Sequence, residues 1–270
     1  MQKFDEIAPI LSNTNLIGDY YLITFKAEKI AETAQPGQFV HVKVPSLKNC
    51  VLRRPFSIYN TDAKAGTVSV IYKVVGQGTE QLCTVQVGTE LDVMGPLGIG
   101  FSNPGEKFPI IVAGGYGCAA TYMQSKISSK KGIVIIGGRT EGDLLLTQEF
   151  ADQGYEVLVS TNDGSKGTKG FVTTVLKDVL DKSKAGNGPA LEDIEIYSCG
   201  PNPMLKAVGE MGLEYGIDSE LSIDEHMCCG VGACFTCVCK TKTDKNQDGW
   251  RYSRTCNEGP VYRASTVHWD

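Results

Sequence analysis

The chain has 270 residues, 41% of them hydrophobic and 21% charged, with a formal net charge of −5. This length is sufficient for two domains, or for two and a small third one, and the composition is that of an ordinary globular protein. The negative charge disfavours a nucleic-acid partner, which would need clustered Lys and Arg. No run approaches the roughly 18 apolar residues of a membrane span, and the N-terminal residues show no signal-peptide pattern. Ten cysteines without such a signal predict a reducing, cytoplasmic location.

Residues 1–102 are predicted to form a small antiparallel β-barrel. Gln38–Val44 alternates apolar and polar side chains, as a half-buried strand does. The same strand character recurs at Pro55–Asn60, Thr67–Val75 and Leu91–Met94. Turn residues separate these runs, and short strands at this spacing are typical of a small barrel. His41 falls within the first strand, where packing or a surface position is a better interpretation than catalysis.

Residues 103–217 change to an alternation of strands and helices, which predicts a parallel α/β sheet with ligands at the carboxyl ends of its strands. Strands are expected at Phe108–Gly115, Gly132–Ile136, Tyr155–Ser160 and Ile194–Ser198. Helices are expected at Ala119–Ser128, Leu144–Phe150, Phe171–Leu180 and Pro203–Gly212, with Lys182–Gly188 as a surface loop. Residues 218–270 are predicted to form a small C-terminal domain around a cysteine-rich loop.

That loop carries the most specific motif of the chain. Its cysteines follow the spacing C-x4-C-x2-C and then, after 18 residues, one further Cys, at positions Cys229, Cys234, Cys237 and Cys256. This is the spacing of a plant-type [2Fe–2S] cluster, in which each of two irons takes two protein thiolates beside the bridging sulfides. Gly230 and Gly232 lie inside the loop, where the backbone must bend tightly around such a group.

Other interpretations of the cysteines are weaker. A structural zinc site usually has two close pairs of Cys or His ligands, and a disulfide framework suits a small secreted domain. Cys228 is out of register with the spacing, and Cys239 lies in an apolar run, so neither is predicted to be a ligand. Asp224, Glu225 and His226 precede the loop and are expected to be a solvated strand end.

Three motifs in the predicted barrel could hold a flavin dinucleotide. Arg54 offers charge-assisted hydrogen bonds to a pyrophosphate, and Ser57 can bond to a flavin ring, although a surface Arg and a strand Ser remain the alternative. Gly78 and Thr79 open a short helix, whose N-terminus favours phosphate. The candidate FAD-binding residues on these grounds are Arg54, Ser57, Gly78 and Thr79, and the family resemblance given below implies Pro55, Phe56, Ile71, Tyr72 and Lys73 as well.

Two motifs in the α/β part could hold a nicotinamide dinucleotide. A glycine-rich turn follows a buried strand and precedes a helix, as a dinucleotide-binding turn does, although a turn without ligand remains open. Cys199 ends the last strand and is the candidate catalytic residue, beside small residues that let a nicotinamide approach a flavin; a buried apolar thiol is the alternative. The candidate NAD(H)-binding residues are Gly114, Gly115, Gly117, Gly200 and Pro201.

The segments RPFSI, GT, GPLGIGF, GGYGCA and CGPNPM, in this order, resemble the ferredoxin–NADP reductase superfamily. The segments EHMCCGVGACFTCVCKT and RTCNEGPVY with the Val–His–Trp ending resemble the electron-transfer subunit of NAD-dependent (type B) dihydroorotate dehydrogenases. The resemblance covers nearly the whole chain. It implies FAD on the barrel, NAD(H) on the α/β sheet and a [2Fe–2S] cluster on the four cysteines.

The resemblance also implies a partner, an FMN-containing catalytic subunit that oxidises dihydroorotate in UMP biosynthesis, in a heterotetramer of two of each. Electrons would pass through the cluster and FAD to NAD⁺. A subunit of a bifurcating transhydrogenase, sulfite reductase or hydrogenase is the alternative, and a non-enzymatic redox sensor is a more distant one. Ala113, Ala120 and Asn162 depart from the family's dinucleotide motifs and leave the choice between NAD and NADP open.

Overall fold

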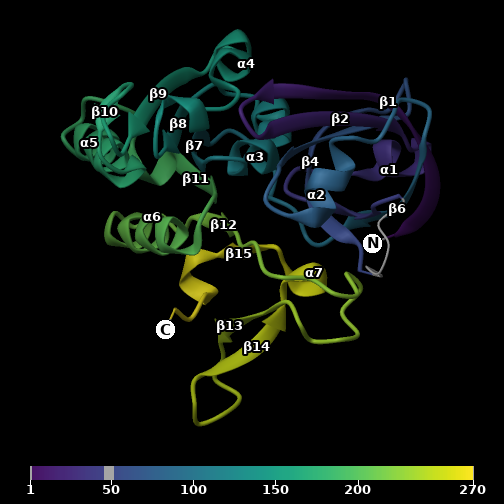
Figure 1. The fold of residues 1–270 in the computed structure, drawn as a ribbon. Helices are drawn as coiled ribbons and strands as arrows, with labels where there is room; N and C mark the ends of the chain where they lie inside the picture. The colour runs from purple at the N-terminus through teal and green to yellow at the C-terminus, as the bar shows by residue number, and fades with distance from the viewer. Residues whose placement is uncertain (1, 46–51, 270) are drawn as a thin grey trace.

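The structure is a computed structural model that describes residues 2–45 and 52–269. Figure 1 shows the barrel on the right, the α/β sheet with its helices on the left, and the C-terminal segment beneath both. In this described part, a closed barrel is followed by a seven-stranded sheet and a two-stranded hairpin. No helix within it is long and apolar enough to cross a membrane.

The barrel has the strand order β1-β2-β5-β4-β3-β6, and every pairing is antiparallel. Its interior is filled by the apolar side chains that alternation predicts, including Phe25, Val40, Val42, Ile58 and Val70. The strands are β1 (Phe4–Ile17), β2 (Tyr20–Lys26), β3 (Phe39–Lys43), β4 (Arg54–Asp62), β5 (Thr67–Lys73) and β6 (Glu90–Leu97), with helices α1 (Glu28–Thr33) and α2 (Gln77–Leu82) between them.

The second sheet has the order β10-β9-β8-β7-β11-β12-β15 and is parallel except for β15. Its strands are β7 (Phe108–Gly114), β8 (Ile133–Gly138), β9 (Glu156–Thr161), β10 (Thr168–Lys169), β11 (Ile194–Cys199), β12 (Glu220–Ser222) and β15 (Val261–Arg263). The helices are α3 (Gly117–Ile127), α4 (Thr147–Asp152), α5 (Val172–Lys184) and α6 (Asn202–Glu214), with single 3-10 turns at Glu141–Asp143, Leu191–Asp193 and Ala264–Thr266. The order from β9 to β11 is that of a doubly wound fold.

All four helices predicted in the α/β part have shifted bounds in the structure, and the largest shifts are at α4 and α5. The helix expected from Leu144 begins only at Thr147, because Leu146 adopts a left-handed conformation with φ of 59°. The helix expected to end at Leu180 continues to Lys184 and takes over part of the predicted surface loop. Lys182 and Lys184 suit a helix C-terminus, and Gly186 with φ of 78° follows the end.

The C-terminal segment is tied to both larger units. Strands β12 and β15 pair with each other, and β12 continues the second sheet beside β11. Between them lie the cysteine loop, the hairpin of β13 (Val238–Lys242) and β14 (Trp250–Arg254), and α7 (Thr255–Glu258). The chain therefore leaves the sheet, builds the loop and hairpin, and returns to the same sheet edge. The two domain boundaries, after residues 102 and 217, stay a prediction.

Candidate cofactor sites

A pocket of about 230 Å³ lies where the barrel, the second sheet and the C-terminal segment meet. Strands β4 and β5 supply one wall, the β7–α3 turn and the end of β11 another, and the residues after β12 a third. Most of the predicted FAD-binding residues and the predicted catalytic cysteine line it, namely Arg54, Pro55, Phe56, Ser57, Ile71, Tyr72, Lys73, Thr79 and Cys199.

Aromatic packing fixes the barrel wall of this pocket. The ring of Tyr72 stacks on the ring of Tyr21, with centroids 5.6 Å apart. The ring of Phe56 packs at a tilt against Tyr72, with a centroid distance of 5.7 Å. The Tyr72 hydroxyl donates a hydrogen bond to Asn13 Oδ1 at 3.0 Å. Burial raises the pKa of Tyr72, so the hydroxyl stays protonated. This wall is a rigid, apolar surface of the kind that a flat ring system needs.

Arg54, Gly78 and Thr79 meet at the barrel end of the pocket. A Cβ atom at Gly78 would lie 2.7 Å from Arg54 Nε, so only glycine lets the guanidinium occupy this place. The Thr79 hydroxyl accepts a hydrogen bond from the backbone N–H of Val75 at 2.9 Å and donates one to the Gly76 carbonyl at 3.0 Å. Helix α2 has six residues, so anion binding here depends on the Arg54 charge more than on a helix dipole.

The predicted dinucleotide turn packs against the end of β11. A Cβ at Gly117 would come within 2.2 Å of the Cys199 carbonyl oxygen, and a Cβ at Gly114 would be 3.2 Å from Pro201 Cδ. Gly115 has φ of 55°, which side chains rarely adopt. These glycines bring the two turns into contact. They and Gly200 do not themselves line the pocket, although Cys199 does.

The thiol of Cys199 is almost fully buried, at 7% exposure. Burial, with a contribution from the charge of Asp224, raises its pKa to about 12. It is therefore a protonated thiol at neutral pH and not a nucleophile. A role as a small side chain beside the ring of a cofactor agrees with this, and covalent chemistry does not.

Several residues of the pocket were missed by the sequence motifs, and two of them, Tyr116 and Asp224, are hydrogen-bonded to each other. Tyr116 lies within the glycine-rich turn, and its hydroxyl donates a hydrogen bond to Asp224 Oδ2 at 3.3 Å. Both side chains line the pocket. Asp224 and His226 are exposed, as expected of a solvated strand end, and Asp224 in addition borders the candidate cofactor site. Burial of its carboxyl group raises the pKa of Asp224, against the hydrogen bond from Tyr116. A Tyr in a glycine turn and an Asp after a short strand carry no recognisable spacing.

A polar network joins the barrel to the second sheet beside the pocket. Tyr20 on β2 donates to Asp143 Oδ1 at 3.0 Å, and Lys73 on β5 donates to the Tyr20 hydroxyl at 3.3 Å. The Lys73 ammonium lies 3.6 Å from the same Asp143 oxygen. Burial opposes ionisation of Asp143, but the Tyr20 bond and the Lys73 charge outweigh it and lower its pKa. Lys73, a predicted FAD-binding residue, is thereby held in place from the opposite unit.

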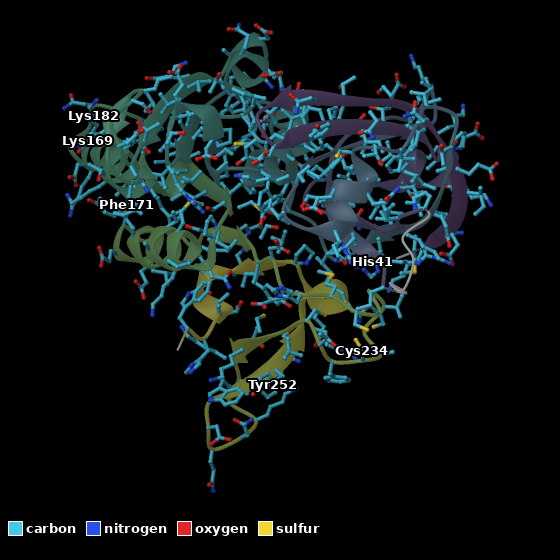
Figure 2. All side chains as sticks on the ribbon, viewed as in Figure 1. His41, Lys169, Phe171, Lys182, Cys234 and Tyr252 are labelled. Atoms are coloured by element: carbon cyan, nitrogen blue, oxygen red, sulfur yellow. The ribbon has the colours of Figure 1, made fainter. Side chains whose placement is uncertain are left out.

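The four predicted cluster cysteines lie in one segment next to the barrel. Cys237 and Cys256 are buried, and they pack with Phe39 of β3 and Leu97 of β6. Cys234 is exposed, and Figure 2 shows it in the C-terminal segment on the side beneath the barrel. The two cysteines that pack on the barrel are therefore buried, whereas Cys234 is open to solvent.

Hydrogen bonds already favour the thiolate form at part of this set. The backbone N–H of Ala233 points to Cys229 Sγ at 3.3 Å. Hydrogen bonds from the Thr236 hydroxyl and backbone lower the pKa of Cys234 to about 6. Burial and the neighbouring Cys237 raise the pKa of Cys256 to about 12, so forming its thiolate costs free energy. An iron that binds the thiolate would offset this cost.

The geometry of the thiols is compatible with a group of two metals. Among residues 2–45 and 52–269, no three Cys, His, Asp or Glu side chains gather around one point as a single ion would require. A two-iron cluster needs only two protein sulfurs at each iron, with bridging sulfides completing the coordination. The donor set, four thiols in one segment, suits that group.

The barrel, the doubly wound sheet and the pocket between them define a class of protein, the FAD-dependent reductases of the ferredoxin–NADP reductase type. Residues 8–100 match the oxidoreductase FAD-binding domain, and residues 224–268 match the iron–sulfur cluster binding domain of dihydroorotate dehydrogenase B. The chain belongs to the family of electron transfer subunits of dihydroorotate dehydrogenase B. The predicted family, fold class, FAD and iron–sulfur cofactors are thereby confirmed.

The relatives cover nearly the full chain. A protein of Fusobacterium nucleatum named dihydroorotate dehydrogenase B (NAD(+)), electron transfer subunit, is 40% identical over 97% of this chain and 98% of its own length. A protein of Geobacillus kaustophilus with the same name is 38% identical over 92% of each chain. These similarities are the basis of the family assignment.

Solved structures agree on the fold. An NADH-dependent reduced ferredoxin–NADP oxidoreductase, described in the context of flavin-based electron bifurcation, has a TM-score of 0.80 and 26% identity, over 98% of this chain and 90% of that one. A ferredoxin–NADP⁺ reductase from Neisseria gonorrhoeae has a TM-score of 0.65 at 14% identity, over 83% of this chain and all of that one. The second likeness shows the fold alone. The roles of individual side chains stay predictions.

Proposed function

We propose that this chain carries electrons between NAD⁺ and a partner subunit that oxidises dihydroorotate, as the name of its relatives implies. The supporting observation is the position of Phe39. This side chain lines the pocket at the barrel wall and also packs against Cys237 and Cys256. The cofactor pocket and the cysteine set are therefore separated by little more than one side chain, as electron exchange between two bound groups requires.

The pocket residues fit a flavin dinucleotide by their chemistry. Arg54 supplies the positive charge for a pyrophosphate, and Gly78 leaves room for the Arg54 guanidinium. The Ser57 hydroxyl and the Lys73 ammonium supply hydrogen-bond donors along the wall that Tyr72 closes. When bound, FAD exchanges electrons in pairs with a nicotinamide and singly with an iron–sulfur cluster.

The opposite wall fits a nicotinamide dinucleotide. The Gly114–Gly117 turn packs closely on the end of β11, which brings Tyr116 and Cys199 to the same wall of the pocket. The protonated Cys199 thiol orients a ring without attacking it. Asp224 lines the same pocket, and its Oδ2 accepts a hydrogen bond from the Tyr116 hydroxyl at 3.3 Å.

The cysteine set fits a [2Fe–2S] cluster held by Cys229, Cys234, Cys237 and Cys256. Cys237 and Cys256 anchor the group on the barrel, and the open side around Cys234 faces away from it. A partner subunit that carries FMN would approach that side. We propose a heterotetramer of two copies of each chain. The nine cysteines that the structure describes are free thiols, which fits a reducing cytoplasm.

Reconstitution tests this function. The purified chain should contain about one FAD and two irons and should oxidise NADH with a dye as acceptor. Dihydroorotate should reduce NAD⁺ only after the FMN-containing subunit is added. Oxidation of dihydroorotate by this chain alone would contradict its role as a subunit.

A second candidate follows from the structural match to the NADH-dependent reduced ferredoxin–NADP oxidoreductase. In that case the chain would serve as the reductase subunit of another flavin complex. Co-purification from the native cell separates the two. A partner that lacks FMN or fails to oxidise dihydroorotate would favour the second candidate.

A further inference from the structure

Strand β3 presents two different faces. Val40 and Val42 point into the barrel core and are 0% and 1% exposed. Side chains alternate along a strand, so Phe39 and His41 lie on the other face. That face is covered by the C-terminal segment, because Phe39 packs with Cys237 and Cys256. The barrel therefore contacts the cysteine segment through β3, together with Leu97 of the neighbouring β6.

The imidazole of His41 is pressed against this loop. A Cβ at Gly230 would lie 2.5 Å from His41 Nδ1 and 3.1 Å from its Cε1. Gly230 directly follows Cys229 and has φ of 69°, so this place in the loop suits a glycine for two reasons. Figure 2 shows His41 at the lower edge of the barrel, above Cys234.

Within the described residues, His41 makes no hydrogen bond through either ring nitrogen. Its side chain is fully buried, and both Nδ1 and Nε2 are without a partner. The nearby Arg53 guanidinium is already engaged by the Asp92 carboxylate at 2.7 Å, and it reaches only the backbone carbonyl of His41. A buried imidazole N–H without an acceptor costs free energy, so the ring is arranged for an acceptor that residues 2–45 and 52–269 do not supply.

His41 also lies beside the flavin motif. It pairs across the ladder with Pro55 of β4, which lines the pocket. One side of the residue is thus next to the wall that would hold the flavin, and the ring edge is next to the loop that would hold the cluster. The other two imidazoles differ from His41, because His268 stacks on Trp250 of the hairpin at 6.1 Å and His226, three residues before Cys229, is exposed.

We propose that His41 is a tuning residue of the iron–sulfur group, whose imidazole N–H donates a hydrogen bond to a sulfur of the cluster or of its Cys229 ligand. This inference rests on the cluster proposed above. A hydrogen bond to sulfur stabilises the reduced cluster, which carries more negative charge, and raises its reduction potential. His41 thereby favours transfer of single electrons from the flavin to the cluster.

The test compares His41→Leu with His41→Gln, which keeps an N–H donor, and with His268→Leu as a matched control. The midpoint potential of the cluster is measured by redox titration with electron paramagnetic resonance, and the flavin potential in the same sample serves as reference. We expect His41→Leu to shift the flavin–cluster electron partition about tenfold toward the flavin, which is about 59 mV for one electron. His41→Gln should recover most of this shift, and His268→Leu should show none.

A second readout does not depend on a stable variant. In the wild-type protein, electron–nuclear double resonance should detect a ¹⁵N-imidazole coupling to the reduced cluster, together with a proton that exchanges in D2O. The coupling should persist in His226→Leu, which removes the exposed imidazole that precedes the cysteine loop. If His41→Leu loses its iron, its cluster potential cannot be measured. The coupling in the wild-type protein then decides, because its presence supports the proposal and its absence overturns it. Flavin–cluster electron partitions within twofold of the wild-type value in both His41 variants, or the absence of an imidazole coupling, would overturn the inference. A wild-type chain without iron would instead refute the cluster itself.

Discussion

At the level of single residues, the proposed cofactor sites depend on a few groups that each have one physical task. Arg54 supplies charge, Tyr72 a fixed ring, Cys199 a protonated thiol and Cys234 a thiolate whose pKa is already lowered. The motifs around Arg54 and the cysteines were recognisable because their spacing is set by ligand chemistry. Tyr116 and Asp224 were not, since their meeting depends on two loops that come together only in the folded chain.

Arg54→Ala should weaken FAD binding by about tenfold to a hundredfold. A hydrogen bond to a charged group contributes roughly 1.5–3 kcal/mol, and each 1.4 kcal/mol is a factor of ten. Flavin fluorescence during titration of the apo-protein gives the dissociation constant. Arg251→Ala, on the exposed hairpin, should bind FAD as the wild type does. Equal affinity of Arg54→Ala and wild type would remove Arg54 from the flavin site.

Cys234→Ser should lower the iron content and abolish electron exchange with the partner, while NADH oxidation by a dye continues. Serine is a poor ligand for iron beside soft sulfides, whereas the dye takes electrons from the flavin. Iron analysis and the two assays measure these effects. The matched control is Cys228→Ser, six residues upstream in the same loop. Loss of the cluster in Cys228→Ser with retention in Cys234→Ser would contradict the ligand assignment.

At the level of elements, the turns decide the site more than the regular strands do. The β7–α3 turn meets the end of β11 through glycine contacts, and α2 brings Gly78 to Arg54. Sequence periodicity predicted the central strands because they are long apolar or alternating runs. It placed the start of α4 wrongly, because the left-handed conformation of Leu146 is imposed by packing and leaves no pattern in the sequence.

Gly117→Ala should destabilise the fold by about 1–3 kcal/mol, the usual effect of overpacking. Its new methyl group would have to move away from the Cys199 carbonyl oxygen, which lies 2.2 Å from the ideal Cβ position. We also expect a higher KM for NADH, because the two turns would separate. Urea denaturation and NADH–dye kinetics measure the two effects. Gly142→Ala, where the nearest atom is 3.6 Å away, should change neither.

At the level of the whole molecule, three parts share one pocket, and their contacts hold it in shape. The sequence motifs predicted that a barrel, a parallel sheet and a cysteine loop are present. They could not predict that β12 and β15 return to the sheet, nor that Phe39 and His41 face the loop. Those features depend on long-range packing between segments whose local sequences are ordinary for strands.

Asp143→Asn should loosen the contact between barrel and sheet by about 1 kcal/mol at pH 7, because it removes the charge that faces Lys73. The folded state lowers the pKa of Asp143 below 3.8, so the stabilisation is present above that pH and is lost as the pH falls through the folded-state value. The difference between variant and wild type should therefore shrink below about pH 4.

Urea denaturation across the pH range measures this difference. The control is Glu141→Gln in the same 3-10 turn, whose carboxylate pairs with the exposed Lys166 at 2.9 Å. This exposed pair should contribute little. A difference for Asp143→Asn that is independent of pH would show that charge is not the cause.

The central claim is that electrons reach the cysteine set from NADH only through the flavin pocket. The most direct test adds NADH without oxygen to the purified chain and records the electron paramagnetic resonance signal of the reduced cluster. The wild-type protein should show this signal within the time of flavin reduction. Arg54→Ala protein dialysed free of flavin, but retaining its iron, should not. A reduced cluster in the flavin-free protein, or none in the wild type with both cofactors present, would contradict the account.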